Sequence, residues 1–127
     1  MTERNPAPPP GRSFDPWNFR TEVAVEISGA KLAGYRVEAA DGALGKVTDF
    51  RLDPGDSHLV LTTGRLFGRE TVLPAGIVNH VDHAERRIYL DRTRDQVKRA
   101  PQLTGAEYAE RRDELADYYA RSLHPSR

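Results

Sequence analysis

The chain has 127 residues and a mass of 14.2 kDa, a size typical of one domain. Its 19 basic and 19 acidic residues give a formal net charge of zero, which argues against a protein that binds nucleic acid or anionic membranes through surplus positive charge. Cysteine is absent, which excludes disulfides, thiol nucleophiles, thiolate zinc sites and iron–sulfur clusters. The sequence has neither a signal peptide nor an apolar stretch long enough for a membrane span, so we expect a cytoplasmic protein.

Residues 1–27 are the first of three predicted segments. Five of the nine prolines lie in the first 16 residues, and proline fixes φ and removes an amide donor. We therefore expect a largely extended or disordered N-terminal arm. Phe14, Trp17 and Phe19 make the end of this arm too apolar for a simple linker. These aromatic residues dock either on the rest of the chain or, as a linear motif, on another protein.

Residues 28–101 predict a small β-domain. Asp41-Gly42 is a hairpin signal, and the alternation of apolar residues changes parity beside Gly45, which predicts a β-bulge. Short strands separated by a turn about every ten residues indicate a mostly β fold, a small antiparallel six-stranded barrel. The predicted strands cover residues 35–39, 44–53, 58–63, 71–73, 77–81 and 88–90.

Two helices follow the predicted strands. Thr93-x-x-Gln96 is a capping box that begins a short helix, and Pro101 ends it. Residues 102–127 form the third segment, in which a second capping box begins at Thr104 and opens an amphipathic C-terminal helix. Tyr108 and Tyr119 belong to the apolar face of this helix. That face packs either on the barrel of the same chain or on a partner subunit.

Three segments in order carry a resemblance to a known family. They are LAGYRVEAADGALGKVTDFRLD (32–53), LPAGIVNHVD (73–82) and RRIYLDRTRDQVKRAP (86–101). Their order resembles the PRC-barrel family, named after the photosynthetic reaction centre and also found in ribosome maturation factors. The resemblance implies a compact barrel of about six strands that serves as a docking surface and has no catalytic residues. We expect a small stand-alone bacterial member, because the chain shows neither a membrane helix nor a second barrel domain on the N-terminal side of this one. Sixteen of the 19 basic residues are arginine, which is compatible with a GC-rich bacterial genome.

Few residues are arranged as catalysis or metal binding would require. His80 and His83, with Asp82 between them and Asp91 further on, could be metal ligands, but an odd spacing across a strand end sends side chains to opposite faces. We interpret both histidines as solvated turn residues. Asp49 and Asp53 would be about 13 Å apart along an extended strand, too far for an acid–base pair. The sequence predicts no catalytic residue, metal, cofactor or small-molecule substrate.

The candidate partner-binding residues are apolar or aromatic side chains bordered by charge. Leu66 and Phe67 lie in a loop between Arg65 and Arg69, where they either anchor a partner or plug one end of the barrel. Trp17, Tyr108 and Tyr119 complete this set. We predict a non-catalytic protein-binding or adaptor module that binds a protein partner or a second copy of itself.

Two alternative functions stay open. The first is an RNA- or ribosome-associated assembly factor that uses Arg94 and Arg99. The acidic residues among these arginines favour an ion-paired surface instead, so we do not expect nucleic acid as a partner. The second is a metal-dependent enzyme that uses His80.

Overall fold

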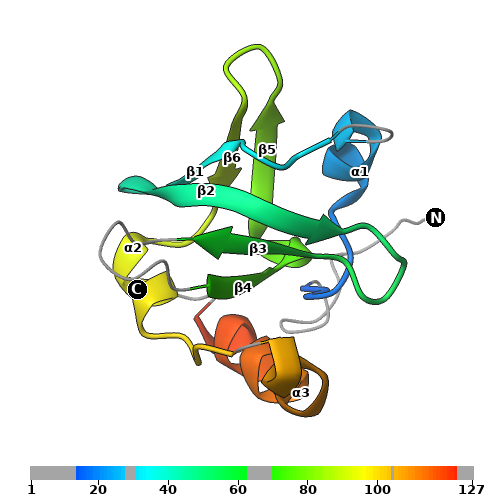
Figure 1. Ribbon diagram of the computed structural model, residues 1–127, viewed down its shortest axis with the longest axis vertical. Helices are drawn as coiled ribbons and strands as arrows, with labels where there is room; N and C mark the ends of the chain where they lie inside the picture. The colour runs from blue at the N-terminus through cyan, green and yellow to red at the C-terminus, as the bar shows by residue number, and fades with distance from the viewer. Residues whose placement is uncertain (1–13, 28–30, 63–69, 104, 123–127) are drawn as a thin grey trace, which may run out of the picture.

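The computed structural model describes residues 14–27, 31–62, 70–103 and 105–122 (Figure 1). The loop with Arg65, Leu66, Phe67 and Arg69 lies outside these ranges, as does Thr104. The elements in chain order are α1 (Thr21–Ile27), β1 (Arg36–Ala39), β2 (Gly42–Arg51), β3 (His58–Thr62), β4 (Glu70–Pro74), the 3₁₀ helix η1 (Ala75–Ile77), β5 (Val78–Asp82), β6 (Arg87–Leu90), α2 (Arg94–Lys98) and α3 (Gly105–Arg121).

The six strands form one sheet in the order β4-β3-β2-β1-β6-β5. This confirms a mostly β fold with six strands, a short helix and a C-terminal helix. One feature of the prediction needs correction, because β1 and β6 pair in parallel and the sheet is mixed rather than wholly antiparallel. The physical reason is that the chain passes from β4 through η1 into β5 without reversing its direction. The β5–β6 hairpin therefore joins the free edge of β1 with β6 running parallel to it.

The sheet is strongly twisted, and β5 and β6 cross steeply over β2, β3 and β4 (Figure 1). In the part of the chain that the structure describes, no ladder joins β4 to β5, so these two strands are the edges of an open sheet rather than neighbours in a closed barrel. The predicted irregularity beside Gly45 is confirmed. The β1–β2 register shifts between Val37 and Glu38, and the β2–β3 register shifts between Val47 and Asp49. Such bulges increase the local twist of a sheet.

One hydrophobic core joins the inner face of the sheet to all three α-helices. Leu59 and Leu61 of β3 are fully buried, as are Val37 of β1 and Ile88 of β6. Helix α3 adds Leu115 to the same core. The apolar face of the C-terminal helix is therefore covered by its own chain, which answers the question that the sequence left open. Within the described ranges, no helix combines the length and apolar character needed to cross a lipid bilayer.

A buried arginine fastens the end of α3 to the sheet. Arg92, just after β6, is 1% exposed, and its guanidinium donates to the backbone oxygen of Tyr119 at 2.9 Å and to Ser122 Oγ at 2.9 Å. It also pairs with the Asp91 carboxylate. The arginine thus donates to one of the carbonyl groups that the last turn of a helix leaves without helical partners.

The described end of the N-terminal arm is folded, unlike the extended arm that the sequence predicts. Residues Thr21–Ile27 form α1, which packs on β5, and Phe14 and Trp17 are buried in the core. A close backbone contact holds this segment in place, because the Gly76 amide donates to the Pro16 oxygen at 3.0 Å. The three-segment division of the chain stays a prediction.

Candidate functional site

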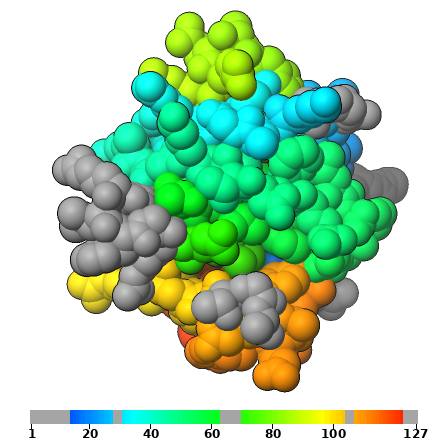
Figure 2. Space-filling model, viewed as in Figure 1, coloured from blue at the N-terminus to red at the C-terminus, as the bar shows by residue number. Residues whose placement is uncertain are grey.

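A pocket of about 300 Å³ opens on the outer face of β2, β3 and β4, beside α3. We call it the β3–α3 pocket. Figure 2 shows this side of the molecule, with the strands above and the helix below. The pocket is lined by Asp49, Arg51, Asp56, His58, Val60, Glu70, Val72, Leu103 and Tyr108.

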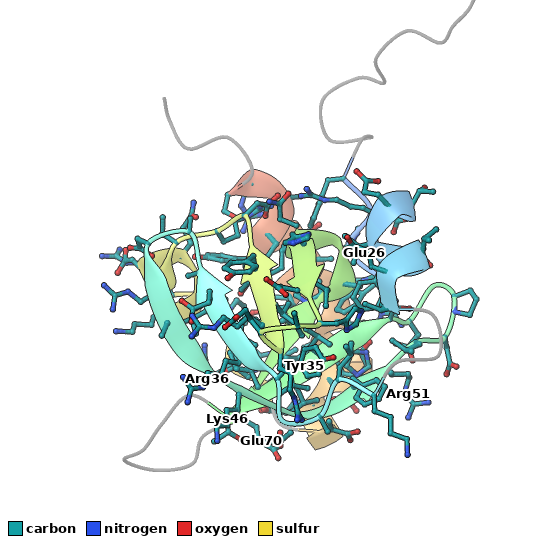
Figure 3. The ribbon with its side chains drawn as sticks, turned by 90° about the horizontal axis from the view of Figure 1, so that it is seen from above. Glu26, Tyr35, Arg36, Lys46, Arg51 and Glu70 are labelled. Carbon is teal, nitrogen blue, oxygen red and sulfur yellow. The ribbon has the colours of Figure 1, made fainter. Side chains whose placement is uncertain are left out.

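Strand alternation explains which side chains reach the pocket. Successive residues of a strand point to opposite faces, so the inward side chains of Leu59 and Leu61 place His58 and Val60 outward. The register then aligns Arg51 of β2 with His58, and Val72 of β4 with Val60. Figure 3 shows Arg51 and Glu70 pointing away from the core on this face.

Asp56, in the turn between β2 and β3, joins the strands to α3. Its carboxylate accepts a hydrogen bond from the Tyr108 hydroxyl and another, at 3.1 Å, from the guanidinium of Arg112. Arg112 also donates to the Gly55 oxygen at 2.7 Å. Its guanidinium carbon lies 4.5 Å from the centre of the Trp17 ring, within the range of a cation–π contact. These contacts fix one wall of the pocket.

His58 is neutral near pH 7 and has a defined tautomer. Its Nδ1 lies 2.9 Å from the backbone oxygen of Asp56, which can only accept, so Nδ1 carries the proton. Burial is the main reason that the pKa of His58 lies below its usual 6.5, and the nearby Asp56 only partly opposes the effect. Burial and the hydrogen bond to Asp56 likewise raise the pKa of Tyr108, so its hydroxyl stays protonated.

The rim of the pocket carries two carboxylates, Asp49 and Glu70, that form no ion pair within the described residues. Both lie on the outer face. The arginine of the pocket is already engaged, because Arg51 lies 3.1 Å from the Asp53 carboxylate and 3.9 Å from that of Asp56. The free charge on the rim is therefore negative.

The floor of the pocket is apolar. Val72 and Leu103 are buried there and Val60 is half-buried, while the aromatic ring of Tyr108 forms a side wall. An apolar floor below a negative rim matches a side chain with an apolar stem and a cationic end, which describes lysine and arginine.

The structure brings together two of the predicted binding residues and separates a third. Tyr108 lines the pocket, and Trp17 packs against it with ring centres 5.6 Å apart. Trp17 itself is 7% exposed. Tyr119 is fully buried in the core beside Arg92, so in this structure its side chain contacts only its own chain.

Sequence reasoning missed the carboxylates and the histidine of the pocket. In the sequence, Asp49 stands out only as a possible partner of Asp53, and no motif includes His58. The outward positions of β2, β3 and β4 could have indicated them. The pairing of these positions with Tyr108, about 50 residues further along the chain, had no signal in the sequence.

His80 and His83 do not converge on one another as metal ligands would. His83 lies between the Tyr35 hydroxyl, at 2.7 Å, and the backbone oxygen of Glu26, at 2.6 Å. The His80 ring nitrogen Nδ1 lies 3.5 Å from the Glu26 carboxylate. Within the described ranges, no group of three or more histidine and carboxylate side chains is placed to hold a metal ion.

Comparisons with known proteins give similarities to solved structures. No protein-family model matches the chain. No curated protein matches it either. A crystal structure of a protein described as a 16S ribosomal RNA processing protein, RimM, of Pseudomonas aeruginosa is similar, with 23% identity and a TM-score of 0.42. The match covers 50% of this chain and 42% of that one, so it spans less than half of that protein's length. Membership of the PRC-barrel family stays a prediction.

Proposed function

We propose that this chain is a non-catalytic protein-binding module, and that the β3–α3 pocket takes a lysine or arginine side chain of its partner. The observation that carries the proposal is the combination of a small apolar floor with two rim carboxylates, Asp49 and Glu70, which form no ion pair with any residue that the structure describes. At about 300 Å³ the pocket is at the lower end of the range of ligand sites, a size that suits one side chain rather than a large cofactor.

The groups around the pocket support binding rather than catalysis. Hydrogen bonds link Tyr108 to Asp56 and to His58, and Arg112 donates to the Asp56 carboxylate as well. A general base needs an unprotonated acceptor atom and a pKa near the working pH. The Tyr108 hydroxyl does not meet this requirement, because burial and Asp56 hold its proton. The network therefore fixes the shape of the wall.

Self-association is an alternative form of the same proposal. The chain has 16 arginines, so a second copy could supply the cationic side chain. A different protein and a second copy are distinguished by the solution mass. A mass near 14.2 kDa at high protein concentration indicates that the partner is another protein.

The RNA-associated alternative, in the form that uses α2, has less support. Arg99 pairs with Asp95 at 2.8 Å, and Arg94 lies 3.8 Å from the Asp41 carboxylate. Both cations are therefore partly neutralised on the chain itself. The cytoplasmic location expected from the sequence also stays a prediction.

A peptide-display selection tests the proposal. The immobilised protein is used to select random peptides, and selection is repeated with Glu70→Lys and with the matched control Glu110→Lys, which changes an exposed glutamate of α3 in the same way. We expect the wild type and the control to enrich the same peptides with an arginine or lysine at a fixed position, and Glu70→Lys to lose them. Equal enrichment by all three proteins, or peptides without a shared basic residue, would contradict the proposal.

A further inference from the structure

A row of cations crosses three neighbouring strands on the outer face of the sheet. Arg36 of β1 lies directly opposite Lys46 of β2 in the antiparallel ladder. On its other side Arg36 is in register with Arg87 of β6 in the parallel ladder. Neighbouring strands are about 4.8 Å apart, so the three cations span roughly 10 Å. Figure 3 shows Arg36 and Lys46 side by side at the surface. We call these three residues the cationic row.

The row is only partly neutralised by its own chain. Arg36 and Lys46 are exposed, and among the described residues neither takes part in an ion pair. Like charges directly opposite each other destabilise a sheet, so this arrangement works against folding. Arg87 lies 3.4 Å from the Glu38 carboxylate, and its buried Nε has no hydrogen-bond partner. The pair with Glu38 uses Nη1, and the Arg87 side chain is 35% exposed, so a ligand can reach the guanidinium from solvent.

An aromatic stack adjoins the row. Tyr89 follows Arg87 by two residues on β6 and therefore points to the same face. Its ring stacks on that of His80 in β5, with centres 5.9 Å apart and planes at 19°. His80 is exposed and Tyr89 is half-buried. Figure 1 shows β6 between β1 and β5, so the stack borders the cationic row.

We propose that single-stranded nucleic acid binds across this face, with phosphates on the cationic row and a base on the Tyr89–His80 stack. Cations that track a backbone and aromatic rings that stack with bases are the two components of single-strand recognition. The stack favours nucleic acid over an acidic peptide, which would use the cations but has no base to place on the rings. The proposed contact residues share none with the lining of the β3–α3 pocket, so the two proposals are tested by different substitutions.

The acidic groups near the row limit the strength of binding. Glu38 engages Arg87, and Asp82, which is in register with Arg87 on β5, accepts the backbone amide of Glu85 at 3.0 Å. Towards β4 the same row ends at Glu70. With about three phosphate contacts, the logarithm of the affinity should fall with the logarithm of salt concentration with a slope of about −2.

The test measures fluorescence anisotropy of a labelled oligouridylate of about 12 nucleotides with the full chain at low salt. Lys46→Glu is compared with Lys98→Glu, which makes the same substitution at an exposed lysine of α2. We expect saturable binding that Lys46→Glu weakens about fivefold or more, that Lys98→Glu changes less than about twofold, and that Tyr89→Leu also weakens. A polyglutamate peptide should compete poorly.

Three outcomes would overturn this inference. The first is no saturable binding of the oligonucleotide at low salt. The second is equal weakening by Lys98→Glu, which would place the contact on α2. The third is a polyglutamate peptide that competes equally while Tyr89→Leu has no effect, which would make the row an acidic-peptide site.

Discussion

The hydroxyl of Tyr108 donates a hydrogen bond to the carboxylate of Asp56, a residue 52 positions earlier in the chain. This bond joins the first half of α3 to the turn between β2 and β3. Arg112, one helical turn later, reaches the same carboxylate. The helix is therefore aligned on the sheet by two contacts to one acidic residue, and these contacts form the wall of the β3–α3 pocket.

Tyr108→Phe tests this alignment. The substitution removes one hydrogen bond to a charged group and leaves Arg112 in place, so we expect the free energy of unfolding to fall by about 1–2 kcal/mol. Urea denaturation measures the change. Tyr89→Phe serves as control, because the Tyr89 hydroxyl forms no hydrogen bond with the described residues, and it should change stability by less than about 0.5 kcal/mol. Equal effects of the two substitutions would show that the Tyr108–Asp56 bond does not stabilise the fold.

Arg92→Met should destabilise the protein by about 3 kcal/mol or more. The variant keeps an apolar stem but leaves the carbonyl of Tyr119 and the Ser122 hydroxyl without their buried donor. Arg94→Met is the matched control, because the Arg94 side chain is 49% exposed, and it should have a small effect. Thermal and urea unfolding of both variants decide the matter. An unfolding midpoint of Arg92→Met equal to that of the wild type would mean that the docking of α3 does not depend on this arginine.

The pH dependence of stability should contain a contribution from His58. Its folded-state pKa is lowered by burial below the unfolded value near 6.5, so the unfolded chain binds the proton more tightly. The contribution is fully present above the unfolded pKa and is lost as the pH falls below 6.5 through the folded-state value. The urea denaturation midpoints of the wild type and of His58→Asn, compared between pH 7.5 and pH 5, measure this contribution. These limits lie about one pH unit or more above and below the unfolded-state pKa. We expect the wild type to lose more stability than the variant over this window. Parallel losses would show that His58 does not titrate differently on folding.

Gly76→Ala should displace the N-terminal segment. A Cβ at this position would lie 2.2 Å from the backbone oxygen of Asp15, a contact that only a backbone shift can relieve. Trp17 is the only tryptophan of the chain, so its fluorescence reports the change. We expect red-shifted emission and a lower melting temperature. Gly34→Ala is the control, since it strains a positive φ but meets its nearest atom at 3.6 Å, and it should lower stability without shifting the emission. Unchanged emission in Gly76→Ala would contradict the packing of residues 14–17.

Local features of the fold were predictable from the sequence. The capping box of Thr93 and Gln96 is present at the start of α2, since both reciprocal hydrogen bonds form. The i,i+4 spacing of Glu107 and Arg111 likewise gives an ion pair, at 3.6 Å. Both features are interactions between residues three or four positions apart, so they depend only on the side chains of a single helical turn.

Long-range features were not predictable in the same way. The parallel pairing of β1 with β6 depends on the path of the chain through η1, which no local pattern encodes. Helix α1 has the sequence TEVAVEI, whose valines and isoleucine have low helix propensity, and its packing on β5 overrides that preference. The sequence gives no sign that Arg92 is buried, because its partners Tyr119 and Ser122 lie about 30 residues away, at the end of α3 and just after it.

The candidate site was predictable only in part. The sequence indicates aromatic residues as candidate binding residues, and one of them, Tyr108, lines the pocket. Asp49 and Glu70 were not selected, because a surface carboxylate is ordinary until the strand register places two of them on one rim. The register comes from the bulges and turns of the whole sheet, so this part of the site required the structure.

The central claim is that the β3–α3 pocket recognises the positive charge of a partner side chain. The most direct measurement compares a display-selected peptide in two forms, with its conserved basic residue as arginine or as the uncharged isostere citrulline, by titration monitored with backbone amide NMR. We predict that the arginine peptide shifts the amides of Asp49, Val60 and Glu70 in a saturable way, and that the citrulline peptide binds at least about tenfold more weakly. Equal affinity for the two peptides, or shifts confined to another face of the protein, would contradict the account.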